Sequence, residues 1–205
     1  MTTASPPTHS SQTTLVLASA SPSRAALLGR LADAFEQQTS HVDETPRPAE
    51  LPATLAARLA REKCEAVSSS RKSTDEPLVV IGADQVAGRD GTRLGKPGNA
   101  KRNVSMLRSC SGKTVVFYSA VHIIDTRSGR SLSHTDITRV RFRTLSADEI
   151  SHYVDHEKPW QCAGGFKVEG RGISLFEIVE STDPTGLIGL PLIFVSKALR
   201  TFDLC

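Results

Sequence analysis

The sequence predicts an α/β fold with a twisted, mixed β-sheet flanked by helices. Short apolar runs of strand character alternate with segments in which apolar residues recur at helical spacing. Asp90-Gly91 is typical of a tight hairpin turn, and Ser128-Gly129 lies between two further strand-like runs. Because hairpins join antiparallel strands, a purely parallel sheet is not expected.

The first half of the chain alternates between strands and helices. Ser21 followed by Pro22 predicts a helix start, because serine caps helix N-termini well and proline fits the first helical position. Leu55, Leu59 and Val67 fall on one stripe of a longer helix. The expected elements are, in order, a strand at 15–18, a helix from Pro22, a strand at 34–40, a proline-broken loop at 41–48, a helix at 51–69 and an apolar strand at 78–83.

The second half continues the alternation. Ser146 and Glu149 match a capping box, which predicts that a helix begins there and runs through Val154. The expected elements are, in order, a helix at 99–108, the hairpin arms 115–125 and 137–145, the helix at 146–154, a glycine-rich segment, two more strands and a final helix from Pro191.

Length and composition limit the possible classes of protein. The chain has 205 residues and a net charge of +3, with 25 basic and 22 acidic residues, so we expect one domain and no polyelectrolyte tail. Its longest apolar stretch, 186–195, contains a proline and is too short to span a bilayer. Residues 1–14 are rich in Ser, Thr and Pro and are expected to form a disordered leader before a single domain at 15–205.

The cysteines suggest a compartment. They are widely spaced and form no C-x-x-C pair, which favours structural thiols over disulfides or zinc. A reduced, cytoplasmic setting therefore fits best. The four cysteines are Cys64, Cys110, Cys162 and Cys205.

A candidate phosphate cradle follows the first strand. A helix that begins at Pro22 directs free N–H groups and the positive end of its dipole at the preceding turn. Serine hydroxyls and Arg24 converge on the same turn, as phosphate binding requires. The alternative is an ordinary capped helix with a solvated arginine.

Four charged residues lie where a fold without a site would not need them. Lys63 lies on the apolar stripe of its helix, so it either snorkels to the surface or points into a cleft and binds an anion. Asp84 follows the strand at 78–83, either lining a crevice at its carboxyl end or capping a turn. Lys96 lies in a rigid loop, and Glu44 in a loop bounded by proline; both also fit a solvated surface.

As a set, these residues predict a site for a divalent metal and a polyphosphate. Carboxylate oxygens suit Mg²⁺ or Mn²⁺, which bridge phosphate oxygens. Phosphoryl and nucleotidyl chemistry depends mainly on positioning and charge neutralisation, which this inventory supplies. No G-x-x-x-x-G-K-[ST], G-x-G-x-x-G or H-E-x-x-H motif occurs, so a kinase or P-loop NTPase is disfavoured.

The chain resembles the Maf family of nucleotide pyrophosphatases. Each matching block is short, but they occur in the family's order and cover nearly the whole chain from Leu15 to Phe202. The blocks are residues 15–24 (LVLASASPSR), 42–45 (VDET), 60–63 (AREK), 81–85 (IGADQ), 94–97 (LGKP), 111–112 (SG), 163–170 (AGGFKVEG) and 189–191 (GLP).

The resemblance implies a fold, an activity and a set of roles. It implies a single ITPase-like catalytic domain at 15–205, with two lobes around a central cleft, that hydrolyses a nucleoside triphosphate between its α and β phosphates. Homodimers are also plausible from it. By position, the phosphate-binding residues would be Ser19, Arg24, Lys63 and Lys96, and the metal-linked carboxylates Glu44 and Asp84, with Asp84 as general base.

Four further positions bear on the base that the site would accept. Gln85 and the run from Lys167 to Glu169 resemble the branch that acts on 7-methyl-GTP, whereas the dTTP/UTP branch typically has Thr and Gln at the positions of Gln85 and Glu169. An ionised Glu169 matches the two adjacent donors of guanine and attracts a cationic methylated base. Ser23 replaces a bulky or basic residue and leaves the breadth of the base pocket open.

The sequence therefore predicts a nucleotide pyrophosphatase that uses Mg²⁺ or Mn²⁺ and acts on 7-methyl-GTP. The alternatives are a dTTP/UTP or broad-specificity enzyme, and a non-catalytic nucleotide-binding regulator of cell division. No membrane association and no stable nucleic-acid complex are expected. Arg139, Arg141 and Arg143 share one face of a strand, and a solvated face explains them better than a nucleic-acid strip.

Overall fold

The computed structural model describes residues 13–72 and 76–204. Their seven strands form one mixed sheet in the order β2-β1-β3-β5-β6-β7, with β4 paired to β3. The predicted α/β fold with a mixed, helix-flanked sheet is confirmed. Residues 1–12, most of the expected leader at 1–14, lie outside the described residues, and the first strand already begins at Thr14.

The elements follow the expected order with a few differences. The strands are β1 (Thr14–Ala18), β2 (Glu36–Gln37), β3 (Leu78–Arg89), β4 (Thr92–Leu94), β5 (Thr114–Asp125), β6 (Ser131–Phe142) and β7 (Phe176–Glu180). The helices are α1 (Pro22–Leu28), α2 (Pro52–Ser70), α3 (Ala100–Cys110), α4 (Ala147–Glu157) and α5 (Leu192–Thr201), with 3-10 turns η1 (Ala163–Gly165), η2 (Arg171–Leu175) and η3 (Gly186–Ile188). The strand expected at 34–40 shrinks to two residues, and β7 alone takes the place of the two strands expected before the last helix.

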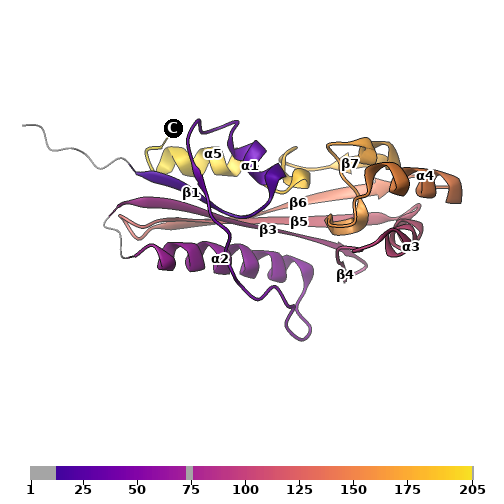
Figure 1. Cartoon of the computed structure of the whole chain (residues 1–205), viewed down its shortest axis with the longest axis horizontal. Helices are drawn as coiled ribbons and strands as arrows, with labels where there is room; N and C mark the ends of the chain where they lie inside the picture. Colours follow the sequence, from indigo (N-terminus) through magenta and orange to yellow (C-terminus); the bar gives the residue numbers. More distant parts are fainter. Residues whose placement is uncertain (1–12, 73–75, 205) are drawn as a thin grey trace, which may run out of the picture.

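Helices cover the sheet on both faces. Figure 1 shows α1 and α5 on one face and α2 on the other, with α3 and α4 at the far end of the long strands. On the α1/α5 face, two separate apolar clusters occupy the two ends of the sheet. One joins β1, α1 and α5, and the other joins α3, α4 and the distal halves of β5 and β6. These clusters are the cores of two lobes that share the strands β3, β5 and β6.

A break in strand pairing separates the lobes along one edge of β3. Strand β1 pairs with β3 up to Ala18, opposite Gly82, and β4 pairs with it only from Ala87 onward. Residues 83–86 therefore have no strand partner on this edge, although β5 pairs with them on the other. Asp84 was expected just after the end of its strand, but β3 continues to Arg89, so Asp84 lies at this break in mid-strand.

Helix α2 approaches β3 most closely at Gly82. A Cβ atom placed there would lie 2.1 Å from the carbonyl oxygen of Ala60 and 2.6 Å from the backbone nitrogen of Cys64. The thiol of Cys64 donates to the carbonyl of Val80 at 3.1 Å, on the same strand. Only glycine permits this contact, which sets the height of α2 above the sheet.

A buried arginine holds the loop before α2 against the helix. Arg58 is 7% exposed and binds both carboxylate oxygens of Glu50 at 2.7 and 2.8 Å. It also binds Glu62 at 2.9 Å and the carbonyl of Thr45 at 3.1 Å. The hydrogen bonds from Arg58 hold the pKa of Glu50 at about 2, well below its usual value. The loop that contains Glu44 is thereby fixed to α2.

A polar strip crosses the α1/α5 face between the two apolar clusters. Its buried carboxylate, Asp136, accepts hydrogen bonds from the hydroxyls of Thr138, Ser181 and Thr182 at 2.9 to 3.3 Å. A Cβ at Gly186 would lie 2.2 Å from Asp136, so the segment 181–189 lies directly on the strip. This segment continues into α5 and forms one wall of the space between the lobes.

We expect Gly82→Ala to destabilise the protein by about 1–3 kcal/mol, because the added methyl group overlaps backbone atoms of α2 that cannot move independently. Gly29→Ala is the matched control, since a Cβ there meets its nearest atom at an ordinary 3.5 Å. Its free energy of unfolding should change by less than about 1 kcal/mol. Urea denaturation of both variants measures the difference. Equal stabilities would show that the α2–β3 contact is not tight.

Candidate active site

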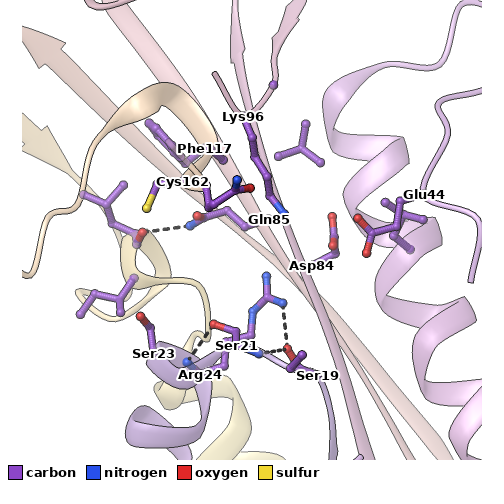
Figure 2. Close-up of a pocket in the computed structure, with 18 of the residues that line it drawn as sticks. Ser19, Ser21, Ser23, Arg24, Glu44, Asp84, Gln85, Lys96, Phe117 and Cys162 are labelled. Atoms are coloured by element: carbon purple, nitrogen blue, oxygen red, sulfur yellow. Dashed lines mark hydrogen bonds between the residues drawn. The ribbon is translucent and has the colours of Figure 1, made fainter. Parts of the chain in front are cut away.

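A cleft of about 870 Å³ lies between the lobes at the break beside β3. Its volume is within the range usual for small-molecule sites. It is lined by every residue that the sequence placed in a site: Ser19, Ser23, Arg24, Glu44, Lys63, Asp84, Gln85, Lys96, Lys167 and Glu169. Figure 2 shows that Ser19 and Arg24, the carboxylates of Glu44 and Asp84, and Lys96 surround one space.

The turn after β1 forms one corner of the cleft. The predicted cap is present, since Ser21 caps α1 and its hydroxyl accepts from the backbone N–H of Arg24 at 3.4 Å. The Arg24 guanidinium donates to the Ser19 hydroxyl at 3.2 Å (Figure 2). It also donates to the carbonyl of Gly189 at 3.0 Å. Burial lowers the pKa of Arg24, an effect that attraction from Asp84 and Glu44 partly offsets. Arg24 is therefore held in one position by two hydrogen bonds. The alternative prediction, a solvated arginine on an ordinary capped helix, is wrong.

Lys63 joins the two carboxylates. Its ammonium nitrogen lies 2.6 Å from Glu44 Oε1 and 2.7 Å from Asp84 Oδ1, and only 9% of its side chain is exposed. Partial burial would raise the pKa of Glu44, but the hydrogen bond and charge of Lys63, with Lys96 and Arg24, outweigh it and lower that pKa. Of the two predictions for Lys63, the one that placed it in the cleft is confirmed. The anions that it contacts in this structure are the carboxylates of Glu44 and Asp84.

The two carboxylates suit a hard divalent cation. Glu44 and Asp84 come from different elements and converge on one cationic atom, so their oxygens can also converge on a metal ion. Within residues 13–72 and 76–204 there is no group of three or more His, Cys, Asp or Glu side chains that could hold a metal. The pair of carboxylates from Glu44 and Asp84 fits Mg²⁺, which binds through one or two carboxylates and completes its shell with water and substrate phosphates.

The opposite side of the cleft contains the residues expected to contact a base. Gln85 and Ser119 face each other across β3 and β5, and both bind the carbonyl of Gly186. The Gln85 amide also donates to the carbonyl of Leu187 at 2.9 Å. Because carbonyls only accept, this side chain uses its N–H groups to hold η3 and leaves its oxygen for a ligand.

Lys167 and Glu169 lie in the segment that closes this side. The backbone N–H of Lys167 is held by the buried hydroxyl of Tyr153 at 3.0 Å. Both side chains are exposed on the lining of the cleft, and the ammonium group of Lys167 lies 3.4 Å from the carbonyl of Glu157. Glu169 therefore presents a carboxylate that a ligand can reach.

Several lining residues were not identified from the sequence. The aromatic rings of Phe117 and Phe166 meet edge to face, with centroids 5.2 Å apart. The half-buried Cys162 also lines the cleft, as Figure 2 shows together with Phe117. Arg93 of β4 also lines the cleft. Phe117 shares a face of the sheet with Gln85, because it lies two residues from Ser119, the partner of Gln85 in the β3–β5 ladder; the sequence alone does not give this pairing.

The arginines at 139–143 lie outside the cleft lining, and two of them form ion pairs. Arg141 of β6 pairs with Glu177 at 3.0 Å, and Arg143, directly after β6, pairs with Glu149 at 2.9 Å, so two of the three arginines expected on one strand face have carboxylate partners. No helix among the described residues has the length and apolar character needed to cross a membrane.

Similar proteins with known names cover almost the whole chain. It is 47% identical over 186 residues to a 7-methyl-GTP pyrophosphatase of Polaromonas sp., covering 91% of this chain and 83% of the relative. It is 46% identical over 186 residues to a protein of the same name from Ralstonia nicotianae, covering 91% and 94%. The solved structure of the Staphylococcus aureus Ham1 protein is a distant likeness, with a TM-score of 0.45 and 10% identity over 92% of this chain and 98% of that one.

The family comparison agrees with the arrangement of the cleft. The model for Maf-like proteins matches residues 14–202, from the first residue of β1 to the residue after α5. The matched region contains both lobes and every lining residue of the cleft. The chain is a member of the Maf-like protein family.

Proposed function

We propose that this protein hydrolyses a nucleoside triphosphate between its α and β phosphates, with 7-methyl-GTP as the preferred substrate. The observation that carries the proposal is the convergence of Glu44, Asp84 and Lys63 in a cleft beside Arg24 and Lys96. Relatives 44–47% identical over most of the chain are named 7-methyl-GTP pyrophosphatases. Carboxylates beside unpaired cations suit the positioning and neutralisation of a polyphosphate.

The hydrolysis needs one proton acceptor at the α-phosphate. A water molecule attacks the α-phosphorus while the bond to the bridging β-phosphate oxygen breaks, so the products are a nucleoside monophosphate and pyrophosphate. Asp84 accepts the proton of the attacking water, and Lys63 holds the Asp84 carboxylate in place. Ser19 and Arg24 bind phosphate oxygens from the opposite corner, where their mutual hydrogen bond fixes both groups.

A divalent cation completes this site in our proposal. Glu44 and Asp84 would hold Mg²⁺ or Mn²⁺, which when bound neutralises phosphate charge and polarises the scissile linkage. The clamp of Arg58 on the loop at 43–50 keeps Glu44 within reach of that position. Lys63 adds a further positive charge beside the carboxylate pair.

The base side of the cleft favours guanine. Glu169 offers two acceptor oxygens to the N1–H and 2-amino groups, and the free oxygen of Gln85 adds a further acceptor. Methylation at N7 makes the base cationic, so the Glu169 charge attracts it. Ser23 is small and leaves room beside α1, and Lys167 borders the same space.

The reduced cytoplasm is the setting that we infer for this activity. Cys64, Cys110 and Cys162 are free thiols. Burial raises the pKa of Cys64 to about 12, so this thiol stays protonated and unreactive. The homodimer and the absence of a stable nucleic-acid complex remain predictions.

Asp84→Asn should lower kcat for 7-methyl-GTP by about 10²–10⁴, because asparagine keeps the shape of the side chain but cannot accept the proton. Resolution of the products as pyrophosphate or orthophosphate establishes which bond breaks. Asp90→Asn is the control, since Asp90 is exposed at the β3–β4 turn outside the cleft lining. Full turnover by Asp84→Asn would remove Asp84 from the role of base.

Chelation with EDTA should abolish hydrolysis, and added Mg²⁺ or Mn²⁺ should restore it, because Glu44 and Asp84 otherwise repel the substrate's phosphates. Glu44→Gln should raise the metal concentration needed for half-maximal activity, since it removes one anionic ligand. Undiminished hydrolysis in EDTA would contradict the metal site. Isothermal titration with Mn²⁺ measures the affinity without depending on turnover.

Glu169→Gln should reduce the preference for 7-methyl-GTP over dTTP and UTP by an amount on the order of 1–3 kcal/mol in kcat/KM, because one acceptor and the negative charge are lost. Glu180→Gln, an exposed change on β7 away from the cleft lining, is the matched control. The four kcat/KM values for 7-methyl-GTP, GTP, dTTP and UTP decide the matter. A wild type that prefers dTTP or UTP would assign the protein to the alternative specificity.

A further inference from the structure

Five basic side chains line the cleft, and they differ in the hydrogen-bond and ion-pair partners that they already have. Arg24 donates to Ser19 and Gly189, Lys63 joins two carboxylates, and the Lys167 ammonium lies 3.4 Å from the carbonyl of Glu157. Within the described residues, the side chains of Arg93 and Lys96 form no hydrogen bond or ion pair. These two therefore have all their donors available for a ligand.

The strand register places Arg93 on the same face of the sheet as the carboxylate Asp84. Alternate residues of β3 share a face, so Asp84 lies on the face of Gly88. Arg93 pairs with Gly88 in the antiparallel β3–β4 ladder, and directly paired residues project to the same side. A Cβ at Gly88 would lie 3.0 Å from Pro52 of α2, which confirms that this is the α2 face.

The separation along the strand suits the length of a polyphosphate. Asp84 and Gly88 are four residues apart, about 13 Å at the usual rise of a strand. The long Arg93 side chain and an extended triphosphate tail together span that distance. In the function proposed above the α-phosphate lies at Asp84 and Glu44, so β and γ phosphates that extend along β3 toward β4 would reach Arg93 and Lys96.

We propose that Arg93 binds the terminal phosphates of the substrate and, after cleavage, the pyrophosphate product. The proposal rests on the function proposed above. A guanidinium binds phosphate oxygens in a bidentate manner, and its exposed position leaves it free to reorient when pyrophosphate leaves. If Arg93 were only solvated and bound no phosphate, its removal would not change inhibition by pyrophosphate. If it binds the terminal phosphates, its removal weakens that inhibition.

The test compares Arg93→Ala and Arg93→Lys with Arg139→Ala, an exposed arginine of β6 outside the cleft lining. For Arg93→Ala we expect KM for the triphosphate and the inhibition constant of pyrophosphate to rise about 10-fold, the scale of one charge-assisted hydrogen bond. Inhibition by the nucleoside monophosphate and kcat should change little. Arg93→Lys should recover part of the loss, and Arg139→Ala should match the wild type.

Two results would overturn the proposal. Unchanged pyrophosphate inhibition in Arg93→Ala would show that the guanidinium does not contact the terminal phosphates. An equal loss for triphosphate, pyrophosphate and monophosphate would assign it to the α-phosphate or to the shape of the cleft. If the wild type hydrolyses no triphosphate, the proposed function fails by itself, and calorimetric titration of each protein with pyrophosphate and Mg²⁺ still decides the role of Arg93.

Discussion

The close contact between α2 and β3 at Gly82 is the constraint on which the rest of the site depends. With a Cβ there, the helix would have to move away from the sheet, since its backbone lies 2.1 Å from that position. Lys63 lies on α2 between Ala60 and Cys64, the two residues at this contact, and it meets the carboxylate of Asp84, two residues along β3 from Gly82, at 2.7 Å. The same helix holds Glu44 through the bonds of Arg58 to the preceding loop. The approach of α2 to β3 therefore places Lys63 beside Asp84, and Arg58 on the same helix keeps Glu44 beside both.

The cleft itself follows from unequal strand lengths. Strand β3 has 12 residues, whereas β1 and β4 cover only its two ends on one side. The uncovered stretch lies between two apolar cores, so neither lobe closes it. The polar strip of Gln85, Ser119 and Asp136 then provides hydrogen bonds for the segment 181–189, which an apolar surface could not hold in one register. An opening in a continuous sheet thus becomes a walled cleft.

The charges of the cleft are divided between groups that hold one another and groups that remain available. Lys63 with its two carboxylates forms a compact unit in which an unpaired buried charge would be costly. Arg24 is fixed by a hydroxyl and a carbonyl, neither of which neutralises it. Lys96 faces the same space without an ion pair among the described residues. This division leaves cationic side chains available in a cleft that also contains three acidic residues.

The sequence by itself determined the features that depend on neighbouring residues. The Ser21 cap, the Ser146–Glu149 capping box and the turns at Asp90-Gly91 and Ser128-Gly129 were predictable because each is a local hydrogen-bonding or backbone preference. The ordered motifs likewise named ten candidate site residues, and all ten line the cleft. Only the tertiary structure decided that β3 continues past Asp84, that Lys63 pairs with carboxylates, and that Gln85 anchors η3. Those outcomes depend on partners 19 to 102 positions away in the chain, and no local propensity encodes such partners.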